Sequence, residues 1–366
     1  MSRLIGMGAA VDITPSRDQV VLFEPKADVP VSDQPALHDL LLGTPLRQLL
    51  RPTRWLVPIV GVSGVFLPGH PLGLIGPVVL ALFGLISLGV TARAVRFVPR
   101  AELDALGASL PRQVRLDDGD LRRSGRVVGI RLPDEDQWLA ARLPVTDVMM
   151  LGRLRRLWVF GPSQGGRIGL LVPGGSGPHV ARLASAPPAG AKPVPEPVPS
   201  AEWPPPPRDD PAVQLEFRRR LRPYLIAMAL LVAVLGWMTV DALVINPVRP
   251  GVSDLLWRFL MPFFGVSALI LLIEIVRTVR ASRATRWACT RVVVVDPPVR
   301  LVFETWKSRV RVDASGDEMA VAGPAALVLA VSESEQLWLI GKPGSRRSKA
   351  VGIPEVPAVG RAQVIR

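Results

Sequence analysis

LWVFGPSQGGRIGLLVP, residues 157–173, has a counterpart later in the chain, LWLIGKPGSRRSKAVGIP at residues 337–354. Both stretches begin Leu-Trp, reach a glycine four residues after the leucine, and end in an apolar run closed by a proline. Each also follows an earlier proline at the same distance, Pro144 in the first copy and Pro324 in the second. The chain therefore carries one pattern twice, and the second copy is one residue longer.

The match extends upstream of these two stretches. Leu50-Arg51-Pro52 opens the first strongly apolar segment, and Leu221-Arg222-Pro223 opens the third. Before them stand Asp33-Gln34-Pro35-Ala36-Leu37 and Asp209-Asp210-Pro211-Ala212-Val213. Three anchors in the same order indicate a duplicated unit that consists of a short helix, a membrane hairpin and a small β module.

Composition favours a membrane protein. The chain is 49% hydrophobic with a mean hydropathy of +0.32, yet its 44 Lys and Arg exceed its 31 Asp and Glu by 13. High hydrophobicity with a basic excess is typical of helices in lipid that are flanked by arginines at an anionic surface. The single cysteine, Cys289, excludes an intramolecular disulfide, so the bulk of the protein either faces a reducing cytoplasm or simply needs no bridge.

Four apolar segments are candidates for membrane spans. In the first hairpin, Trp55–Leu67 is short for a span of about 20 residues and is either tilted or re-entrant, whereas Leu72–Val95 is long enough alone. In the second hairpin, Tyr224–Ile245 and Trp257–Val276 are both long enough. We therefore expect a protein of the cell membrane with four segments.

Arginines gather at one end of each hairpin and predict its orientation. The residues are Arg93, Arg96, Arg100, Arg218, Arg219, Arg220, Arg222, Arg277 and Arg280. Positive charge marks the cytoplasmic side, so both termini and both β modules are expected in the cytoplasm. The same arginines are candidate contacts for anionic lipid headgroups.

The expected fold class is an α+β membrane protein with two transmembrane hairpins, each followed by a small antiparallel β module. The domain boundaries follow from composition: a cytoplasmic segment with an amphipathic helix (1–51), hairpin 1 (52–95), β module 1 (96–184), a proline-rich linker (185–211), a juxtamembrane helix with hairpin 2 (212–286), and β module 2 (287–366). The prolines of the linker favour an extended, semi-rigid spacer.

Short apolar runs separated by Gly, Pro and Asp predict the strands of both modules. In module 1 they are Arg126–Leu132, Val145–Leu151, Leu157–Phe160 and Ile168–Val172, with a short helix at His179–Ala184. In module 2 they are Arg291–Val295, Arg300–Trp306, Val310–Val312, Ala326–Val331, Leu337–Ile340 and Ala350–Ile353, with a tight turn at Asp296-Pro297-Pro298. In each Leu-Trp strand, we expect Trp158 or Trp338 to be buried in the core of its own module.

These residues carry a resemblance to a known family. Val114-Arg115-Leu116-Asp117-Asp118-Gly119, Trp138 and the Leu157-Trp158-Val159 strand that leads to Pro173 are similar to bacterial PH-like membrane proteins, especially the YcxB-like group. In the second unit Trp306, Leu337-Trp338-Leu339 and Ile353-Pro354 are the similar residues, although this unit lacks the Asp-Asp-Gly turn. The resemblance implies a small split-sheet barrel closed by a C-terminal helix, and it implies no catalytic residue.

Two sequence patterns are candidates for catalytic or metal-binding motifs, and neither supports that chemistry. Gly161-Pro162-Ser163-Gln164-Gly165 matches the hydrolase elbow G-x-S-x-G, with Ser163 as nucleophile and His179 as base. A strand rather than a helix is expected after this turn, and the duplicate Gly341-Lys342-Pro343-Gly344 keeps the turn without the serine. The three histidines and one cysteine have no metal-ligand spacing, so we expect no enzyme, cofactor or metal.

Two acidic residues lie within the apolar segments, Glu274 and Asp241. Such residues are functional candidates by default, but a local pair of Glu274 with Arg277, and of Asp241 with Arg258, is the simpler explanation.

The resulting functional hypothesis is a non-enzymatic integral membrane protein whose duplicated cytoplasmic modules act as interaction or scaffold domains. Its partners would be membrane lipids and either a protein or a second copy of the chain. The alternative is a component of a membrane transport or channel system. Nucleic-acid binding is not expected, because aromatic residues do not interleave with the basic runs.

Overall fold

The computed structural model describes residues 20–41, 100–133, 137–162, 166–195, 203–240, 252–301, 305–341 and 348–365. The chain forms two compact units. The first combines Met1–Arg47, Phe97–Glu216 and Ala281–Arg366, and the second combines Gln48–Arg96 and Phe217–Arg280. The first predicted hairpin, 52–95, lies outside the described residues.

Module 1 is an open antiparallel sheet. Its strands are β1 (Arg112–Arg115), β2 (Leu121–Ser124), β3 (Val127–Leu132), β4 (Gln137–Arg142), β5 (Arg156–Phe160), β6 (Arg167–Leu171), β7 (His179–Ala184) and β8 (Lys192–Pro193), in the order β1-β5-β6-β7-β4-β3-β2-β8. Helix α4 (Arg100–Gly107) precedes β1, and helix α5 (Val145–Leu154) connects β4 to β5. A short 3-10 helix, η2 (Val31–Asp33), lies in the N-terminal segment before helical residues 35–41.

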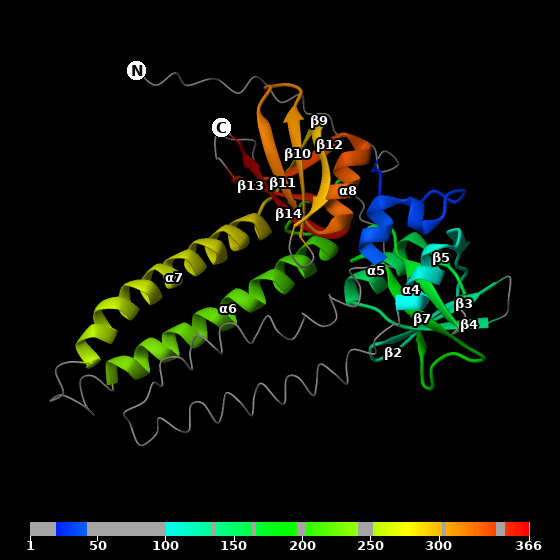
Figure 1. Cartoon of the computed structure of the whole chain (residues 1–366), viewed down its shortest axis with the longest axis horizontal. Helices are drawn as coiled ribbons and strands as arrows, with labels where there is room; N and C mark the ends of the chain where they lie inside the picture. Colours follow the sequence, from blue (N-terminus) through cyan, green and yellow to red (C-terminus); the bar gives the residue numbers. More distant parts are fainter. Residues whose placement is uncertain are drawn as a thin grey trace. The chain divides into compact units, whose positions relative to one another are not determined.

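Module 2 is a closed barrel (Figure 1). Its strands are β9 (Trp287–Arg300), β10 (Trp306–Val312), β11 (Glu318–Gly323), β12 (Gln336–Ile340), β13 (Ser348–Ile353) and β14 (Val356–Val364), in the order β10-β11-β14-β13-β12-β9. Helix α8 (Ala325–Ser334) connects β11 to β12. The long strand β9 closes the barrel, because Trp287–Arg291 pair with β12 and residues from Val292 onward pair with β10.

One part of the predicted duplication, the segment that ends in each Leu-Trp stretch, repeats in the backbone. Pro144 and Pro324 are the N-caps of α5 and α8, with φ and ψ of −57° and 152° in one and −58° and 152° in the other. Both helices end at a left-handed residue, Arg155 (φ 49°) or Glu335 (φ 53°), and a Leu-Trp strand follows at once. Each unit therefore repeats one helix–strand frame.

Two stretches predicted as strands, Val145–Leu151 and Ala326–Val331, are wrong, because they form α5 and α8. Short apolar runs that are buried on nearly every side show no helical periodicity, so the run alone does not separate helix from strand. The helix predicted at His179–Ala184 is strand β7, and the turn predicted at Asp296-Pro297-Pro298 lies inside β9. The pairing of β9 with β10 is irregular at those prolines, which is where a strand tolerates them.

The expected membrane fold is also wrong. Helices α6 (Pro211–Val240) and α7 (Val252–Ser282) occupy the second predicted hairpin, but no helix within the described residues is both long and apolar enough to cross a bilayer. The fold class of an α+β membrane protein is therefore corrected to a mainly β fold with two antiparallel sheets. The described helices do not support the expected location as four segments in the cell membrane.

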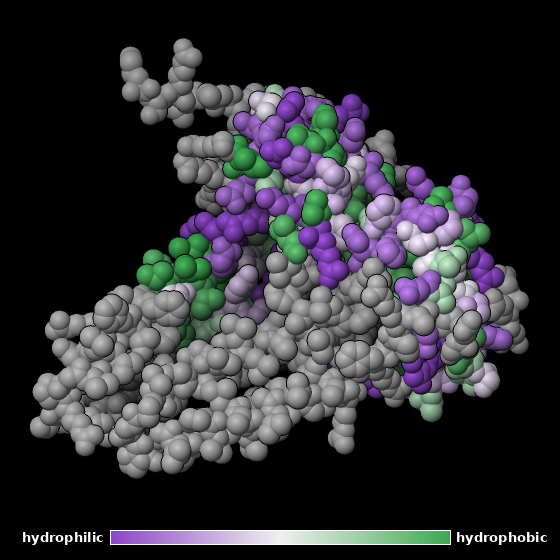
Figure 2. Space-filling view, in the orientation of Figure 1, coloured by the Kyte–Doolittle hydropathy of each residue, from purple (hydrophilic) through white to green (hydrophobic). Residues whose placement is uncertain are grey.

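The described part of α7 is nonetheless apolar and uncovered. Val266, Leu269 and Ile270 are each more than half exposed, and Figure 2 shows hydrophobic side chains gathered over this helix. Their spacing places them along the helix at intervals of three and four residues, which is one continuous surface.

The two modules share one hydrophobic core. A single cluster of buried side chains includes Val128, Ile130 and Leu139 of module 1 together with Leu327 and Val351 of module 2. The buried apolar side chains of the two modules are therefore in continuous contact.

The two matched tryptophans are buried, as expected, but not in this shared core. Trp158 is 7% exposed and belongs to a second cluster, which it forms with Phe160 and with residues of α4 and the N-terminal segment such as Leu37. Trp338 is 4% exposed and meets Trp287 edge-on, with ring centroids 6.2 Å apart. Trp158 therefore packs with Leu103, Leu106 and Leu171 of its own module as expected, and the N-terminal segment adds residues that the sequence did not predict.

Candidate functional site

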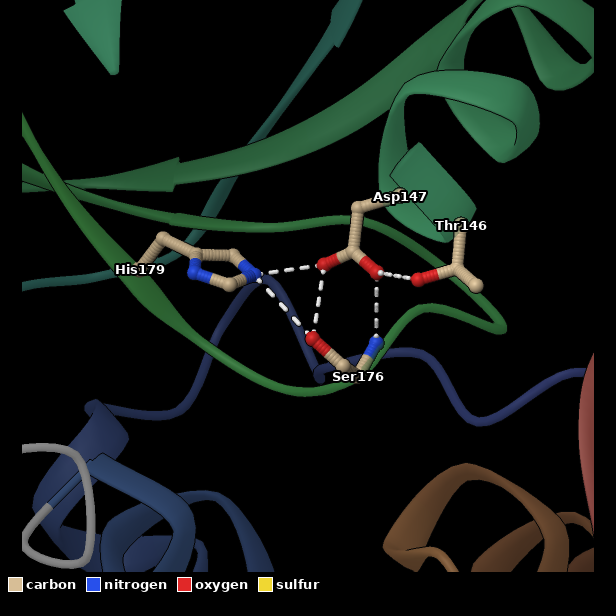
Figure 3. A network of polar contacts seen from close by, with 4 residues as sticks. All are labelled: Thr146, Asp147, Ser176 and His179. Carbon is tan, nitrogen blue, oxygen red and sulfur yellow. Dashed lines mark hydrogen bonds and ion pairs between the residues drawn. The ribbon is translucent and has the colours of Figure 1, made fainter. Parts of the chain in front are cut away.

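A network of polar side chains surrounds Asp147 in module 1 (Figure 3). The Asp147 carboxylate is fully buried. One oxygen, Oδ1, accepts hydrogen bonds from the Ser176 backbone N–H at 2.9 Å and from the Thr146 hydroxyl at 3.1 Å. The other oxygen, Oδ2, accepts from the Ser176 hydroxyl at 3.0 Å and lies 2.5 Å from Nε2 of His179. All described partners of the carboxylate thus come from α5 and from the chain leading into β7.

Local sequence explains why these groups meet. Asp147 stands in the first turn of α5, where the helix dipole favours a negative charge. The chain turns back after β6 through a hydrogen bond from the Gly175 N–H to the Val172 carbonyl, 2.9 Å long. A Cβ on Gly175 would lie 3.1 Å from the Asp147 Cγ, so glycine lets the loop run against the carboxylate. His179 then opens β7.

The network keeps Asp147 ionised. Burial alone would raise the pKa of the carboxyl group, because it disfavours the charged form. The charge interaction with His179 and the hydrogen bonds from His179 and Ser176 outweigh that effect and lower the pKa of Asp147 below its usual value. The carboxylate therefore contributes stability above about pH 4 that is lost as the pH falls.

The arrangement differs from a catalytic triad. A triad needs one histidine nitrogen on the carboxylate and the other on the nucleophile. Here Nε2 of His179 faces both Asp147, at 2.5 Å, and the Ser176 hydroxyl, at 3.5 Å. The Ser176 hydroxyl donates to Asp147 rather than to the histidine. The geometry suits a support for the loop 173–178 more than a group-transfer site.

That loop carries a contact between the modules. A Cβ on Gly174 would lie 2.9 Å from Cε of Met150 and 3.1 Å from Cγ1 of Val356, which belongs to β14. Gly174 also has a φ of 69°, a conformation that glycine adopts without strain. The Asp147 network thus holds a loop that packs directly against module 2.

A second polar junction ties three parts of the first unit together. Arg153 of α5 forms an ion pair with Glu355, in the turn between β13 and β14, and its Nη1 donates to the Glu355 carbonyl at 2.8 Å. The Glu355 backbone N–H donates to Oδ2 of Asp210 at 2.5 Å. Oδ1 of Asp210 accepts from the N–H groups of Ala212 and Val213 and so caps α6. Module 1, module 2 and the start of α6 meet at this point.

The buried position of Asp210 disfavours the charged form of its carboxyl group. Burial raises the pKa of Asp210 to about 6, although the N–H groups of Val213 and Ala212 and the charge of Arg153 act in the opposite direction. An aspartate whose folded pKa is raised loses stability as the pH rises between its unfolded pKa of about 4 and that folded value. The junction therefore weakens between about pH 4 and about pH 6.

The structure describes some of the residues that the sequence suggested for chemistry, and others lie outside the described residues. Ser163 lies outside the described residues, whereas His179, its expected partner, is engaged by Asp147 and Ser176. Glu274 pairs with Arg277 at 2.9 Å, which confirms the local pair. Asp241 lies outside the described residues.

The structure describes some of the arginines that were predicted to mark the ends of the hairpins. Arg218, Arg219 and Arg222 of α6 and Arg277 and Arg280 of α7 are exposed, and Arg220 is half-buried. The structure does not describe Arg93 and Arg96, nor the side chain of Arg100. The described residues do not test whether these arginines mark topology or bind lipid, and both roles stay predictions.

Sequence reasoning missed Asp147 and Asp210. Asp147 was hidden inside a predicted strand, although an acid three residues after Pro144 is typical of the first turn of a helix. Asp210 stands directly before Pro211, the usual order of an N-cap and a first helical proline. Within the described residues no group of three or more His, Cys, Asp or Glu could hold a metal ion.

Comparison with known proteins identifies no relative: no protein-family model, curated protein or solved structure matches this chain. The resemblance to PH-like proteins stays a prediction.

Proposed function

We propose that this chain is a non-enzymatic interaction protein in which two duplicated β modules act as a single scaffold for a protein partner or a second copy. The observation that carries the proposal is the hydrophobic cluster that runs through both modules. A shared core holds the outer surfaces of the two modules in one fixed relation, which a platform for a partner requires.

The polar groups support a structural role for the chemistry-bearing side chains. Asp147, Ser176 and His179 satisfy one another and brace a loop against Val356 of module 2. Arg153, Glu355 and Asp210 likewise hold elements together. Groups that are used up in internal contacts of this kind stabilise and specify a fold.

The test compares association with turnover in the same preparations. The full chain and the variants Ser176→Ala and His179→Ala are first checked by thermal unfolding. Their association is then measured by light scattering and by quantitative cross-linking, and hydrolysis is followed on a panel of ester and amide substrates. We expect all three chains to form the same assembly and to show equal background hydrolysis. Turnover by the full chain that disappears in a folded Ser176→Ala variant would contradict the proposal.

A further inference from the structure

The segment Pro187–Val194, which we call the strap, crosses the outer face of module 1. The chain leaves β7 at Ala184 and reaches the far edge of the sheet as β8, which pairs with β2. Between these points it lies over the face opposite the core. The strap is the first part of the stretch for which a spacer was expected.

The outer face is defined by the alternation of the strands. Leu121, Ile130 and Leu139 form one register row and are buried in the core. The adjacent row, Arg122, Gly129, Ala140 and Arg182, therefore points to the opposite face, and Trp138 shares that face with Ala140.

A proline of the strap fits into a slot on this face. A Cβ on Gly129 would lie 2.5 Å from Cδ of Pro188 and 3.3 Å from Cε3 of Trp138, so the missing side chain of Gly129 makes room for both. The Arg122 guanidinium lies over the Trp138 ring, 5.7 Å from its centroid. A proline ring against an aromatic wall is the chemistry by which aromatic-lined grooves select extended proline segments.

The strap also completes the edge of the sheet. Pro193 and Lys192 are in antiparallel register with Arg122 and Arg123. The Val194 N–H donates to the Leu121 carbonyl at 3.0 Å. The Ser124 hydroxyl donates to the Ala189 carbonyl at 3.0 Å. Addition of an extended segment to a free strand edge is a general way of binding peptides.

The attachment of the strap is slight. Only two residues of β8 are in register with β2, and Ala189, Gly190, Lys192 and Pro193 are exposed. Pro187, Pro188, Ala191 and Val194 are only half-buried. A segment with few apolar contacts and exposed hydrogen bonds opens at low free energy.

We propose that the strap is an intramolecular ligand that occupies a peptide-binding site, and that a partner protein displaces it with an extended, proline-containing segment of its own. The inference rests on the proposed interaction function and names the partner's chemistry. The partner's proline takes the slot at Gly129 and Trp138, and its backbone pairs with β2. An acidic side chain beside that proline is favoured, because Arg122 and the exposed Arg182 flank the slot in the same row.

The experiment uses a fluorescent synthetic peptide with the sequence of the strap, SAPPAGAKPVP (185–195), as its probe. The full chain is compared with a strap-weakened chain, Pro188→Gly with Val194→Ser, by fluorescence anisotropy. In the full chain the tethered strap competes at a high effective concentration, so we expect the strap-weakened chain to bind the peptide at least about tenfold more tightly. Equal binding by both chains would overturn the inference.

Two controls place the binding at the proposed slot. Addition of Gly129→Leu to the strap-weakened chain fills the slot and should abolish the gain in affinity. A peptide in which the counterpart of Pro188 is alanine should lose binding to the strap-weakened chain, and this control needs no change in the protein. A gain that survives both controls would overturn the assignment of the site. If the full chain still self-associates or retains a protein partner while no chain binds the peptide, the strap inference fails and the proposed function stands.

Discussion

Modules 1 and 2 place different kinds of side chain, one charged and one apolar, at the same buried position. The third residue of α5 is Asp147 and the third residue of α8 is Leu327, and both are fully buried. Across from them, His179 pairs with Leu170 in module 1, and at the matching register Gly360 pairs with Val351 in module 2. Asp147 meets His179, whereas Leu327 packs so closely on Gly360 that a Cβ there would collide with it.

The difference shows that one backbone frame accepts two kinds of core. In module 2 an aliphatic side chain over a glycine closes the core without polar groups. In module 1 a carboxylate and a histidine occupy the same place, and the loop 173–178 is added to satisfy them. A buried carboxylate is stable only while its partners are in place, so this position should depend on polar partners and on pH in module 1, whereas the matching position in module 2 carries no charge.

The largest effect is expected from placing the charge of module 1 in module 2. Leu327→Asp would bury a carboxylate opposite Gly360, which has no side chain to pair with it. An unpaired buried charge should lower the free energy of unfolding by more than about 4 kcal/mol, a large part of the 5–15 kcal/mol of a typical domain. Urea unfolding followed by circular dichroism measures the loss. A change of less than about 1 kcal/mol would show that the two positions are not equivalent.

Removal of the carboxylate from module 1 should have the next largest effect. Asp147→Ala leaves the Ser176 N–H and hydroxyl and the His179 ring without their acceptor, and should cost about 3–5 kcal/mol. Asp147→Asn, which keeps the shape and one acceptor oxygen, should cost less. The wild type should lose this stability below about pH 4, because the pKa of Asp147 is lowered in the folded state, whereas Asp147→Ala should not. An unchanged acid dependence would contradict this account of the network.

At the junction of the modules we expect a smaller effect with the opposite pH dependence, because there the free energy of unfolding falls as the pH rises. Asp210→Asn keeps a side chain that caps α6 well but removes the ionisation. Because burial raises the pKa of Asp210 to about 6, the wild type should lose up to roughly 3 kcal/mol as the pH rises from about 4 to about 6. The variant should show a flatter profile in that range. Thermal unfolding in a pH series measures the difference, and parallel profiles would refute the role of Asp210.

The sequence predicted the repeat better than the elements within it. The paired Leu-Trp stretches and their prolines identified a frame that the backbone repeats. They did not identify α5 and α8, because runs such as Ala325–Val331 are buried along their whole length and carry no amphipathic signal. The apolar runs of α6 and α7 suggested membrane spans, whereas no helix within the described residues is both long and apolar enough to cross a bilayer.

The candidate sites were harder to predict, because they depend on contacts between distant segments. Asp147 and Ser176 are 29 residues apart, and Arg153 and Glu355 are 202 apart. Only the local features of each site were visible in the sequence, such as an acid in a first helical turn or a proline after an aspartate. The partners of Asp147 follow from the tertiary fold of module 1, those of Arg153 follow from the docking of the two modules, and neither has a local signature.

The most direct test of the account is whether the two modules unfold as one body. Native-state hydrogen exchange in increasing urea reports the free energy of opening at individual amides. The Leu139 amide in β4 and the Val321 amide in β11 lie in strands that are paired on both sides, and both side chains belong to the shared core. The account predicts that their opening free energies merge into one global value. Exchange of Leu139 through a separate opening at lower free energy, while Val321 stays protected, would contradict it.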